Sequence, residues 1–416
     1  MKQRLRFWFR LVGMGILAAI LAAGCAGMPG PPPHAPSGPL TRIAPGQPGY
    51  PRFDDDMDGD GLEHALEKSL EYLHRLPPDR HFTFAADRFD TAHMIRSIEV
   101  FLGFIRTRPS PDALREFVAR RYRVYRSTGG SETGRVLFTG YFEPIIQGSP
   151  IPTERYRHPV YSRPADLVTI DLSKFSKKFK GETLIGRHAK NNRVVPYYDR
   201  QQIEEQRVLD GNAEELAWVD DPVDLFFLQV QGSGKVYLTG GQSLNVHYHT
   251  TNGRPYRSIG KLLIEQGAIA RSDMSMQAIR RYLNDHPESL RKVLNYNPSY
   301  VFFKLEEDGP LGSLSVRLTP GRSIATDRRL FPKGALAFID TRQPLITAEG
   351  RIDSWTRLSR FVLNQDTGGA IRGAGRADVF WGNGPYAEIA AGHMKEAGDL
   401  YFLILEPAAA VSSGLP

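Results

Sequence analysis

The spacing of apolar residues changes along the chain and divides it into regions of different structure. Apolar side chains recur every three or four positions over 62–76 and 91–106, which predicts two amphipathic helices, and a shorter helix is predicted over 111–122. From Arg135 the period shortens towards two, as it does in strands. The chain is therefore expected to form helices first and β structure afterwards.

Short strands separated by polar turns, glycine and proline dominate from Ile145 to Leu244, which suggests a small barrel. Helical spacing then returns before a final β region, 311–405, that is again rich in glycine. The pattern alone supports a mainly β protein with peripheral helices. The predicted strands of these regions are 159–162, 167–171, 194–198, 217–219, 226–230 and 301–304, and the predicted helices are 200–209, 258–266, 275–284 and 287–294.

Length and charge exclude several classes of function. A chain of 416 residues can bury a large core and suggests two or three domains. Its net charge of +7 is spread along the chain, without zinc-finger spacing or an aromatic RNA-binding signature, so nucleic acid is not an expected partner. A basic surface suits an anionic polymer or membrane. The 11 histidines show no metal-binding spacing, and without G-x-G-x-x-G or a phosphate loop neither metal nor cofactor is predicted.

The amino terminus has the organisation of a bacterial lipoprotein signal peptide. Basic residues within 1–10 precede an apolar run, 11–23, that is too short for a comfortable membrane span. We therefore expect residues 1–24 to be removed and Cys25 to be acylated; a plain secretory signal with a chance cysteine is the alternative. Because this is the only cysteine, structural disulfides are excluded. Dense proline and glycine make 25–60 an extended tether.

One acidic stretch, 56–67, matches the loop pattern D-x-D-x-D-G-x5-E of a calcium-binding EF-hand. Its flanks argue against calcium, because no helix can enter from the preceding proline-containing segment and Glu63 stands where such loops are normally apolar. The favoured interpretation is an acidic linker that caps the helix starting near Leu62.

A glycine-rich stretch, Asn364–Gly382, carries two carboxylates in a setting that suits acid/base chemistry. An apolar run leads into Asp366, a Gly-Gly pair follows, and Asp378 opens a second apolar run. Two strands joined by such a connection would each deliver one carboxylate to the same place, because glycine lets a backbone turn sharply and approach a ligand closely. Ordinary turn chemistry with solvated aspartates is the alternative.

The sequence around these carboxylates resembles the three-aspartate (3D) domain that ends the membrane-bound lytic murein transglycosylase A family. The matching motifs are ATDRRLFPKG, which contains Asp327, QDTGGAIRG, which contains Asp366, and ADVFWG, which contains Asp378. Two upstream motifs follow the family's order, GYFEP at 140–144 and QVQGSG at 229–234.

The resemblance implies domains that periodicity alone does not predict. A double-psi β-barrel catalytic domain is expected from 61–145 together with 245–408, with the three-aspartate segment at 311–405. A second small β-barrel, 146–244, is expected as an insertion, with a groove between the two barrels.

The activity that the resemblance implies is that of a peptidoglycan lytic transglycosylase. Such an enzyme cleaves the β-1,4 bond between N-acetylmuramic acid and N-acetylglucosamine and forms 1,6-anhydromuramic acid. Asp378 is the implied catalytic residue, first as acid and then as base, with Asp366 and Asp327 in support. Its pKa must lie well above the ~4 of a free aspartate. Burial beside Val379–Trp381 and repulsion from nearby carboxylates are both expected to raise it.

Polar side chains of two motifs are candidate contacts to the glycan. Amide and hydroxyl groups suit sugar recognition, although QVQGSG also suits a turn and a tyrosine at a strand end is often packing. The candidate substrate-binding residues are Gln229, Gln231, Gly232, Ser233, Tyr141 and Glu143. Candidates for stacking on sugar rings, with core packing as the default, are Trp218, Trp355, Trp381 and Tyr141.

The implied partner is peptidoglycan, reached from a lipid anchor. Ala26 rather than aspartate follows Cys25, so resemblance to known lipoproteins favours the periplasmic face of the outer membrane. Two other functions remain open. An inverting glycoside hydrolase would need a second carboxylate, such as Glu143 or Asp366, to activate water. A non-catalytic, expansin-like module would bind the wall without cleaving it.

Overall fold

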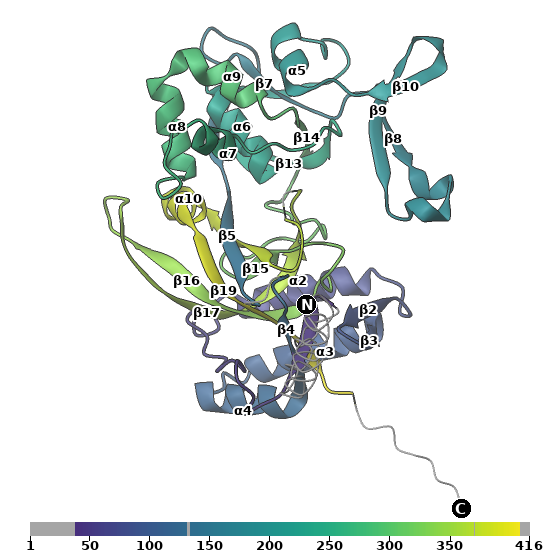
Figure 1. The fold of residues 1–416 in the computed structure, drawn as a ribbon, viewed down its shortest axis with the longest axis vertical. Helices are drawn as coiled ribbons and strands as arrows, with labels where there is room; N and C mark the ends of the chain where they lie inside the picture. Colours follow the sequence, from purple (N-terminus) through teal and green to yellow (C-terminus); the bar gives the residue numbers. More distant parts are fainter. Residues whose placement is uncertain (1–37, 131–133, 370, 408–416) are drawn as a thin grey trace, which may run out of the picture. The chain divides into compact units, whose positions relative to one another are not determined.

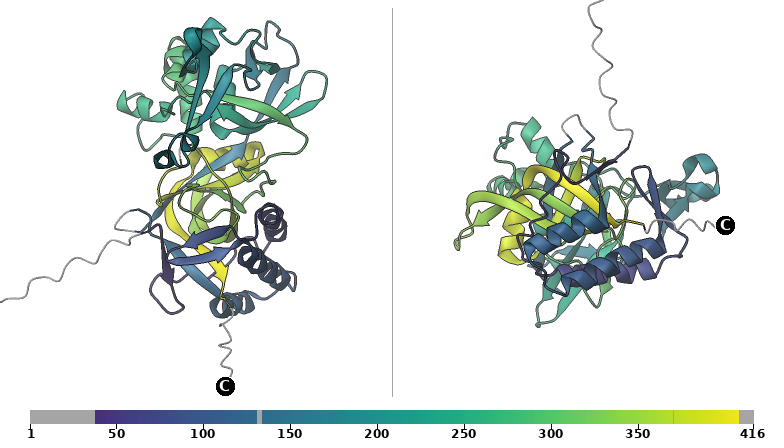
Figure 2. Two further views of the ribbon diagram at one scale, coloured as in Figure 1. Left: turned by 90° about the vertical axis from the view of Figure 1, so that its right-hand side faces the viewer. Right: turned by 90° about the horizontal axis from the view of Figure 1, so that it is seen from below.

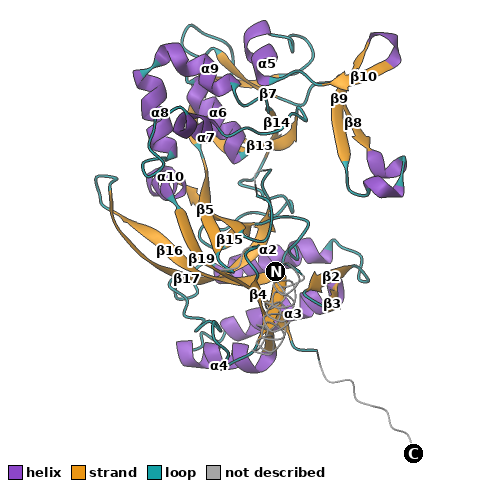
Figure 3. Ribbon diagram, in the orientation of Figure 1, coloured by secondary structure: helices purple, strands orange, loops and turns teal. Residues whose placement is uncertain are grey.

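The computed structural model describes residues 38–130, 134–369 and 371–407 (Figures 1 and 3). Within these residues the strands form two large and two small sheets, and short helices pack around them. This is the mainly β arrangement with peripheral helices that the sequence predicts.

Six strands of the larger sheet close into a barrel. The strands of this sheet are β1 (Leu40–Ile43), β4 (Tyr122–Ser127), β5 (Val136–Glu143), β15 (Ser323–Ala325), β16 (Leu336–Ile346), β17 (Ile352–Asp366), β18 (Arg376–Asn383) and β19 (Lys395–Leu405). They run in the order β1-β4-β19-β16-β17-β15-β18-β5, and β19 pairs with β5 as well. That last pairing joins the ends of the run from β19 to β5, so this ring has no unpaired edge.

The second large sheet has the order β14-β13-β12-β6-β11-β7. Its strands are β6 (Ile145–Ser149), β7 (His158–Tyr161), β11 (Glu215–Val219), β12 (Ser233–Leu238), β13 (Ser243–Thr251) and β14 (Val301–Glu306). Ser162, directly after β7, bridges to Phe303 of β14, so the sheet curls towards closure. The sheet runs past the predicted boundary at Leu244, because β13 and β14 complete it.

The smaller sheets are peripheral. One pairs β8 (Leu167–Asp171), β9 (Thr183–Ala189) and β10 (Arg193–Pro196), and the other pairs β2 (His81–Phe84) with β3 (Asp87–Asp90). Strand β8 has the predicted bounds.

Helices cover the sheets. They are α2 (Leu62–His74), α3 (Thr91–Ile105), α4 (Pro111–Arg121), α5 (Arg200–Gln206), α6 (Pro222–Gln231), α7 (Ile259–Glu265), α8 (Met276–Asp285), α9 (Leu290–Asn295) and α10 (Gly384–His393). The first three lie together against the barrel strands (Figure 2, right). No helix of the described residues is long and apolar enough to cross a membrane.

The predicted strand over 226–230 is wrong, because these residues belong to α6. Pro222 occupies the first turn, and the side chain of Asp221 accepts a hydrogen bond from the N–H of Val223 as the N-cap. Most of the apolar side chains of α6 are buried. A short helix that is apolar on all sides has no 3.6-residue pattern and looks like a buried strand in sequence.

The barrel core continues into the first helices. Phe101 of α3 lies 5.1 Å from Phe361 of β17 between ring centroids, and Phe53 stacks on the same ring at 5.7 Å. The second sheet has its own core, which includes Val160, Val236 and Phe303. Each sheet therefore buries a separate apolar cluster, as stable layers must.

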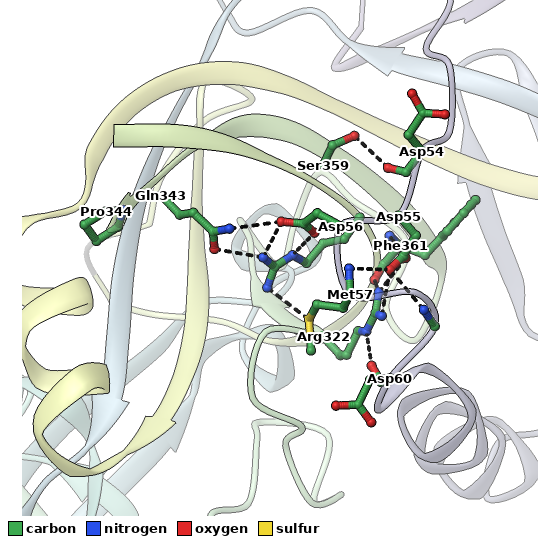
Figure 4. Close-up of polar contacts among 12 residues, drawn as sticks. Asp54, Asp55, Asp56, Met57, Asp60, Arg322, Gln343, Pro344, Ser359 and Phe361 are labelled. Carbon is green, nitrogen blue, oxygen red and sulfur yellow. Dashed lines mark hydrogen bonds and ion pairs between the residues drawn. The ribbon is translucent and has the colours of Figure 1, made fainter. Parts of the chain in front are cut away.

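Arginines from the barrel bind the acidic stretch that precedes α2 (Figure 4). Asp55 pairs with Arg322 through contacts of 2.6 Å and 2.9 Å, and Asp56 pairs with Arg360 through two contacts of 2.7 Å. The two arginine side chains are 0% and 5% exposed. We call residues 54–60 the acidic brace.

Both end carboxylates of the EF-hand-like pattern, 56–67, are bound by arginines. The first, Asp56, binds Arg360, and the last, Glu67, binds Arg106 at 2.7 Å. In the part of the chain that the structure describes, no three acidic, histidine or cysteine side chains are grouped to hold a metal ion. The predicted capping role is wrong, because the N-cap of α2 is Gly61, at φ 70°, and no side chain caps the helix.

Candidate active site

Asp366 and Asp378 lie in one row across the barrel. Ala325 of β15 pairs with Asp366 of β17 on one side and with Asp378 of β18 on the other, and Asp378 pairs in turn with Thr139 of β5. Directly paired residues project from the same face of a sheet. The two carboxylates therefore face the same way, separated by the small side chain of Ala325.

Asp378 is held through only one of its carboxyl oxygens. Oδ1 accepts a hydrogen bond from the Thr139 hydroxyl and lies 3.4 Å from Nε of Arg376. Neither contact reaches Oδ2, which has no hydrogen-bond donor within the described residues. The side chain is 15% exposed, so the carboxyl group is not sealed off from a ligand.

Burial raises the pKa of Asp378, whereas the charge of Arg376 and the hydrogen bond from Thr139 act to lower it. Of the two causes predicted from the sequence, desolvation raises this pKa, and repulsion by a neighbouring carboxylate is not among the causes. A carboxyl group with these surroundings can keep its proton at a pH where an exposed aspartate has lost it.

Asp366 is more firmly bound. Its Oδ1 accepts hydrogen bonds from the backbone N–H groups of Ser313 and Thr367, both at 2.8 Å, and its Oδ2 accepts one from the Tyr141 hydroxyl at 2.9 Å. Burial raises its pKa, although these three hydrogen bonds and the nearby His247 act against the rise. With donors on both oxygens, Asp366 is built to accept hydrogen bonds in a fixed place.

Asp327 is an ionised anchor for the connection between β17 and β18. It is 1% exposed, and Oδ2 accepts hydrogen bonds from the N–H of Gly373, at 2.9 Å, and from Arg329. Burial alone would raise the pKa of this carboxyl, but the hydrogen bonds from Arg329 and Gly373 outweigh it and hold the pKa at about 2. Asp327 therefore cannot supply a proton near neutral pH.

The glycine-rich connection depends on close backbone approach. Gly373 has φ 83°, which favours glycine, and a Cβ on Gly375 would lie 2.2 Å from the carbonyl oxygen of Gly129. The backbone of the connection is therefore fixed at Gly373 and Gly375, and β18 begins in register with β5.

The motifs GYFEP and QVQGSG interlock. Gly232 ends α6 in the left-handed conformation, and a Cβ on Gly234 would lie 2.9 Å from the carbonyl oxygen of Pro144. The side-chain oxygen of Gln231 accepts a hydrogen bond from the N–H of Phe142 at 3.2 Å. This contact ties the end of α6 to β5, which carries Tyr141.

The other residues predicted to contact the glycan differ in how far their side chains are exposed to solvent. Gln229 is 4% exposed and accepts a hydrogen bond from Arg200 at 2.6 Å, and Glu143 is 1% exposed and accepts one from Asn383 at 2.9 Å. Ser233 and Gln231 are partly exposed. Trp218 and Trp381 are buried, as the default of core packing predicts, whereas Trp355 is half-buried.

Known proteins share both the sequence and the fold. A family profile described as "MltA specific insert domain" matches residues 137–304, and one described as "3D domain" matches 322–404. Membrane-bound lytic murein transglycosylase A of Vibrio cholerae is 35% identical over 281 residues, which cover 67% of this chain and 68% of that protein. The chain belongs to the membrane-bound lytic murein transglycosylase A family.

Solved structures of the family have the same architecture. A membrane-bound lytic murein transglycosylase from Agrobacterium tumefaciens superposes with a TM-score of 0.72 at 29% identity, covering 88% of this chain and 98% of that one. E. coli MltA with bound chitohexaose superposes with a TM-score of 0.66 at 24% identity, covering 90% and 98%. The predicted fold class is confirmed, and so is the predicted enzyme class, a lytic transglycosylase.

The residues of the candidate active site are shared between the two matched family domains. The insert match runs from β5 to β14 and contains both interlocking motifs, and the 3D match contains Asp327, Asp366 and Asp378.

Sequence reasoning did not single out Thr139 and Arg376, which contact Asp378. A signal was available for the arginine, because alternate residues of a strand share a face and Arg376 stands two positions before Asp378. The loop whose Ser313 N–H donates to Asp366 had no such signal.

Proposed function

We propose that this enzyme cleaves the β-1,4 bond between N-acetylmuramic acid and N-acetylglucosamine in peptidoglycan, with Asp378 as the single catalytic residue and 1,6-anhydromuramic acid as the product. The observation that carries the proposal is the state of Asp378: burial raises its pKa, one oxygen is fixed by Thr139 and Arg376, and the other is free. A proton donor needs these three properties together.

Two proton transfers run through this one carboxyl group. Protonated Asp378 gives its proton to the glycosidic oxygen as the bond from that oxygen to the anomeric carbon of the muramic acid breaks. The C6 hydroxyl of the same muramic acid then attacks the anomeric carbon. Asp378, now a carboxylate, takes the hydroxyl proton, which closes the anhydro ring and restores the starting state. Neither water nor a protein nucleophile is consumed.

The other two aspartates support this chemistry without carrying the proton. Asp366, fixed by Tyr141, Ser313 and Thr367, is placed to accept a hydrogen bond from a sugar hydroxyl on the same face as Asp378. Asp327 positions the connection that leads into β18.

We assign substrate contacts to the partly exposed groups of QVQGSG. The Gln231 amide keeps its N–H₂ donor available, because its oxygen is used by Phe142, and Ser233 adds a hydroxyl. Gln229 and Glu143 act from behind this layer, since both are buried. Trp355 and Tyr141 are the more accessible of the candidate stacking rings.

Product analysis on purified sacculi tests the proposal. Muropeptides with anhydro ends are expected. Reducing ends would instead identify an inverting hydrolase, and binding without any soluble product would identify a wall-binding module.

Replacing Arg376 with glutamine is expected to move the alkaline limb of the pH–activity profile to higher pH. The guanidinium favours ionised Asp378, so its removal raises the pKa of that carboxyl further, and the proton is kept to a higher pH. The measurement is kcat against pH on soluble glycan strands. Arg372→Gln, an exposed arginine in the connection before β18, is the control. A shift to lower pH, or the same shift in both variants, would contradict the assignment.

The predicted membrane anchor, Cys25, lies outside the residues that the structure describes. We propose that this cysteine is acylated and holds the enzyme on the periplasmic face of the outer membrane. Cys25→Ser is expected to move the protein from the membrane fraction to the soluble periplasm, with activity on soluble glycan unchanged. A mature terminus at another residue, found by mass spectrometry, would refute the anchor.

A further inference from the structure

A cavity of about 490 Å³ is lined by residues of α5, α7 and α9. These three helices lie in the upper half of Figure 1. None of these helices carries a residue of the candidate active site. The polar side chains that matter here are Gln201 and Glu205 of α5, Arg291, Lys292 and Asn295 of α9, and Tyr296 directly after it.

One wall of the cavity is a set of oriented acceptors. Glu205 accepts a hydrogen bond from the Asn295 amide N–H₂ through Oε1, at 2.7 Å, and from the Gln201 amide N–H₂ through Oε2, at 3.1 Å. Because each amide turns its donor towards Glu205, each amide oxygen points away from it. Oδ1 of Asn295 is shielded from solvent and has no hydrogen-bond partner in the described part of the chain. A buried acceptor of this kind favours a ligand N–H.

The other wall is cationic. Arg291 and Lys292 are consecutive, exposed residues of α9, and neither forms an ion pair within the residues that the structure describes. Unpaired cations beside a cavity favour a carboxylate, which arginine can bind through two parallel hydrogen bonds. The Tyr296 ring and Leu262 add an apolar floor.

We propose that this cavity is a second binding site, for a short acidic peptide, and that its ligand is the stem peptide of peptidoglycan. A peptide supplies several amide N–H groups for the acceptor wall and several carboxylates for the cationic wall within one short chain, whereas peptide-free glycan offers only one lactyl carboxylate on each muramic acid. This inference rests on the proposed function for the choice of peptide. This second site binds the stem peptide of a strand whose glycosidic bond is cleaved at Asp378.

The probe is the free tetrapeptide L-Ala-γ-D-Glu-meso-diaminopimelate-D-Ala, titrated calorimetrically into the full-length protein. Arg291→Glu is expected to weaken binding at least 10-fold, and Lys292→Glu to act in the same direction. The matched control is Arg281→Glu on α8, which is exposed, lies outside the cavity lining and changes the net charge equally. It is expected to change the affinity less than twofold.

Turnover separates this site from the active site. Arg291→Glu is expected to leave kcat on peptide-free glycan unchanged and to raise KM only for peptide-substituted strands. The inference is overturned if the wild-type protein does not bind the tetrapeptide, if Arg281→Glu loses affinity as Arg291→Glu does, or if KM rises equally on peptide-free glycan, which would make the cavity a glycan site. Tetrapeptide binding without anhydro products would instead refute the proposed function and keep the peptide site.

Discussion

Replacing Asp378 with asparagine is expected to lower kcat on purified sacculi by about 10²–10⁴-fold, the usual contribution of a positioned acid and base. Asparagine keeps the shape of the side chain and leaves Oδ1 as an acceptor for the Thr139 hydroxyl, so the fold and glycan binding should persist. It has no proton to give the leaving oxygen. The measurements are the release of anhydro-ended muropeptides and thermal unfolding of both proteins.

Asp366→Asn is the matched comparison, since it makes the same chemical change in the same row of the barrel. An amide nitrogen there would face one or more of the donors on Ser313, Thr367 and Tyr141, so positioning suffers, but the proton carried by Asp378 remains. We expect a smaller loss than for Asp378→Asn. An equal or larger loss in a folded protein would make Asp366 the better candidate acid, and wild-type turnover in Asp378→Asn would remove Asp378 from the chemistry.

The local spacing of apolar residues was sufficient to predict a helix or strand where only one face of that element packs against the core. Helices α2 and α3 were predicted within two residues of their ends because their apolar residues repeat at helical spacing, and β8 was predicted with its bounds. Helix α6 was missed because most of its apolar residues are buried. Helix α10 was missed because its buried residues are alanines, which give little apolar contrast.

The sequence predicted only part of the candidate active site. Glycines and apolar runs next to Asp366 and Asp378 indicate these two carboxylates, but the residues that contact them come from distant segments of the chain. Ser313 reaches Asp366 from 53 positions away, and Thr139 reaches Asp378 from 239 positions away. No local rule specifies such pairs, since they are set by the order β17-β15-β18-β5 of a closed barrel. The direction of each pKa shift depends on the same pairs.

The acidic brace shows how a misleading motif becomes informative once its partners are known. Arg322 directly precedes β15, and its guanidinium also donates to the carbonyl oxygens of Asp60 and Phe361. Arg360 lies in β17, six positions before Asp366. The brace therefore ties together β15 and β17, the strands that carry Ala325 and Asp366. Because residues 54–60 fall within the predicted tether, 25–60, this end of the predicted tether is bound to the barrel and is not a free linker.

Replacing Asp55 with alanine is expected to destabilise the protein by about 3–5 kcal/mol, because it leaves the 0% exposed guanidinium of Arg322 without a counter-charge. Urea unfolding at pH 7 measures the loss. Asp340→Ala is the control, since the carboxylate of Asp340 pairs with Arg357 at 2.7 Å with side chains 30% and 50% exposed, and such a pair contributes about 0–1 kcal/mol.

The pH dependence and a double replacement distinguish a buried charge from lost packing. Hydrogen bonds and the charge of Arg322 lower the pKa of Asp55 against the effect of burial. A lowered folded-state pKa stabilises the fold fully above the unfolded value of ~4, and this contribution is lost as the pH falls through the folded value. The difference between wild type and Asp55→Ala should therefore shrink in acid. Asp55→Leu combined with Arg322→Met should recover much of the stability, because it removes both charges. A double variant as unstable as Asp55→Ala, with a difference that does not depend on pH, would show that packing rather than charge holds the brace to the barrel.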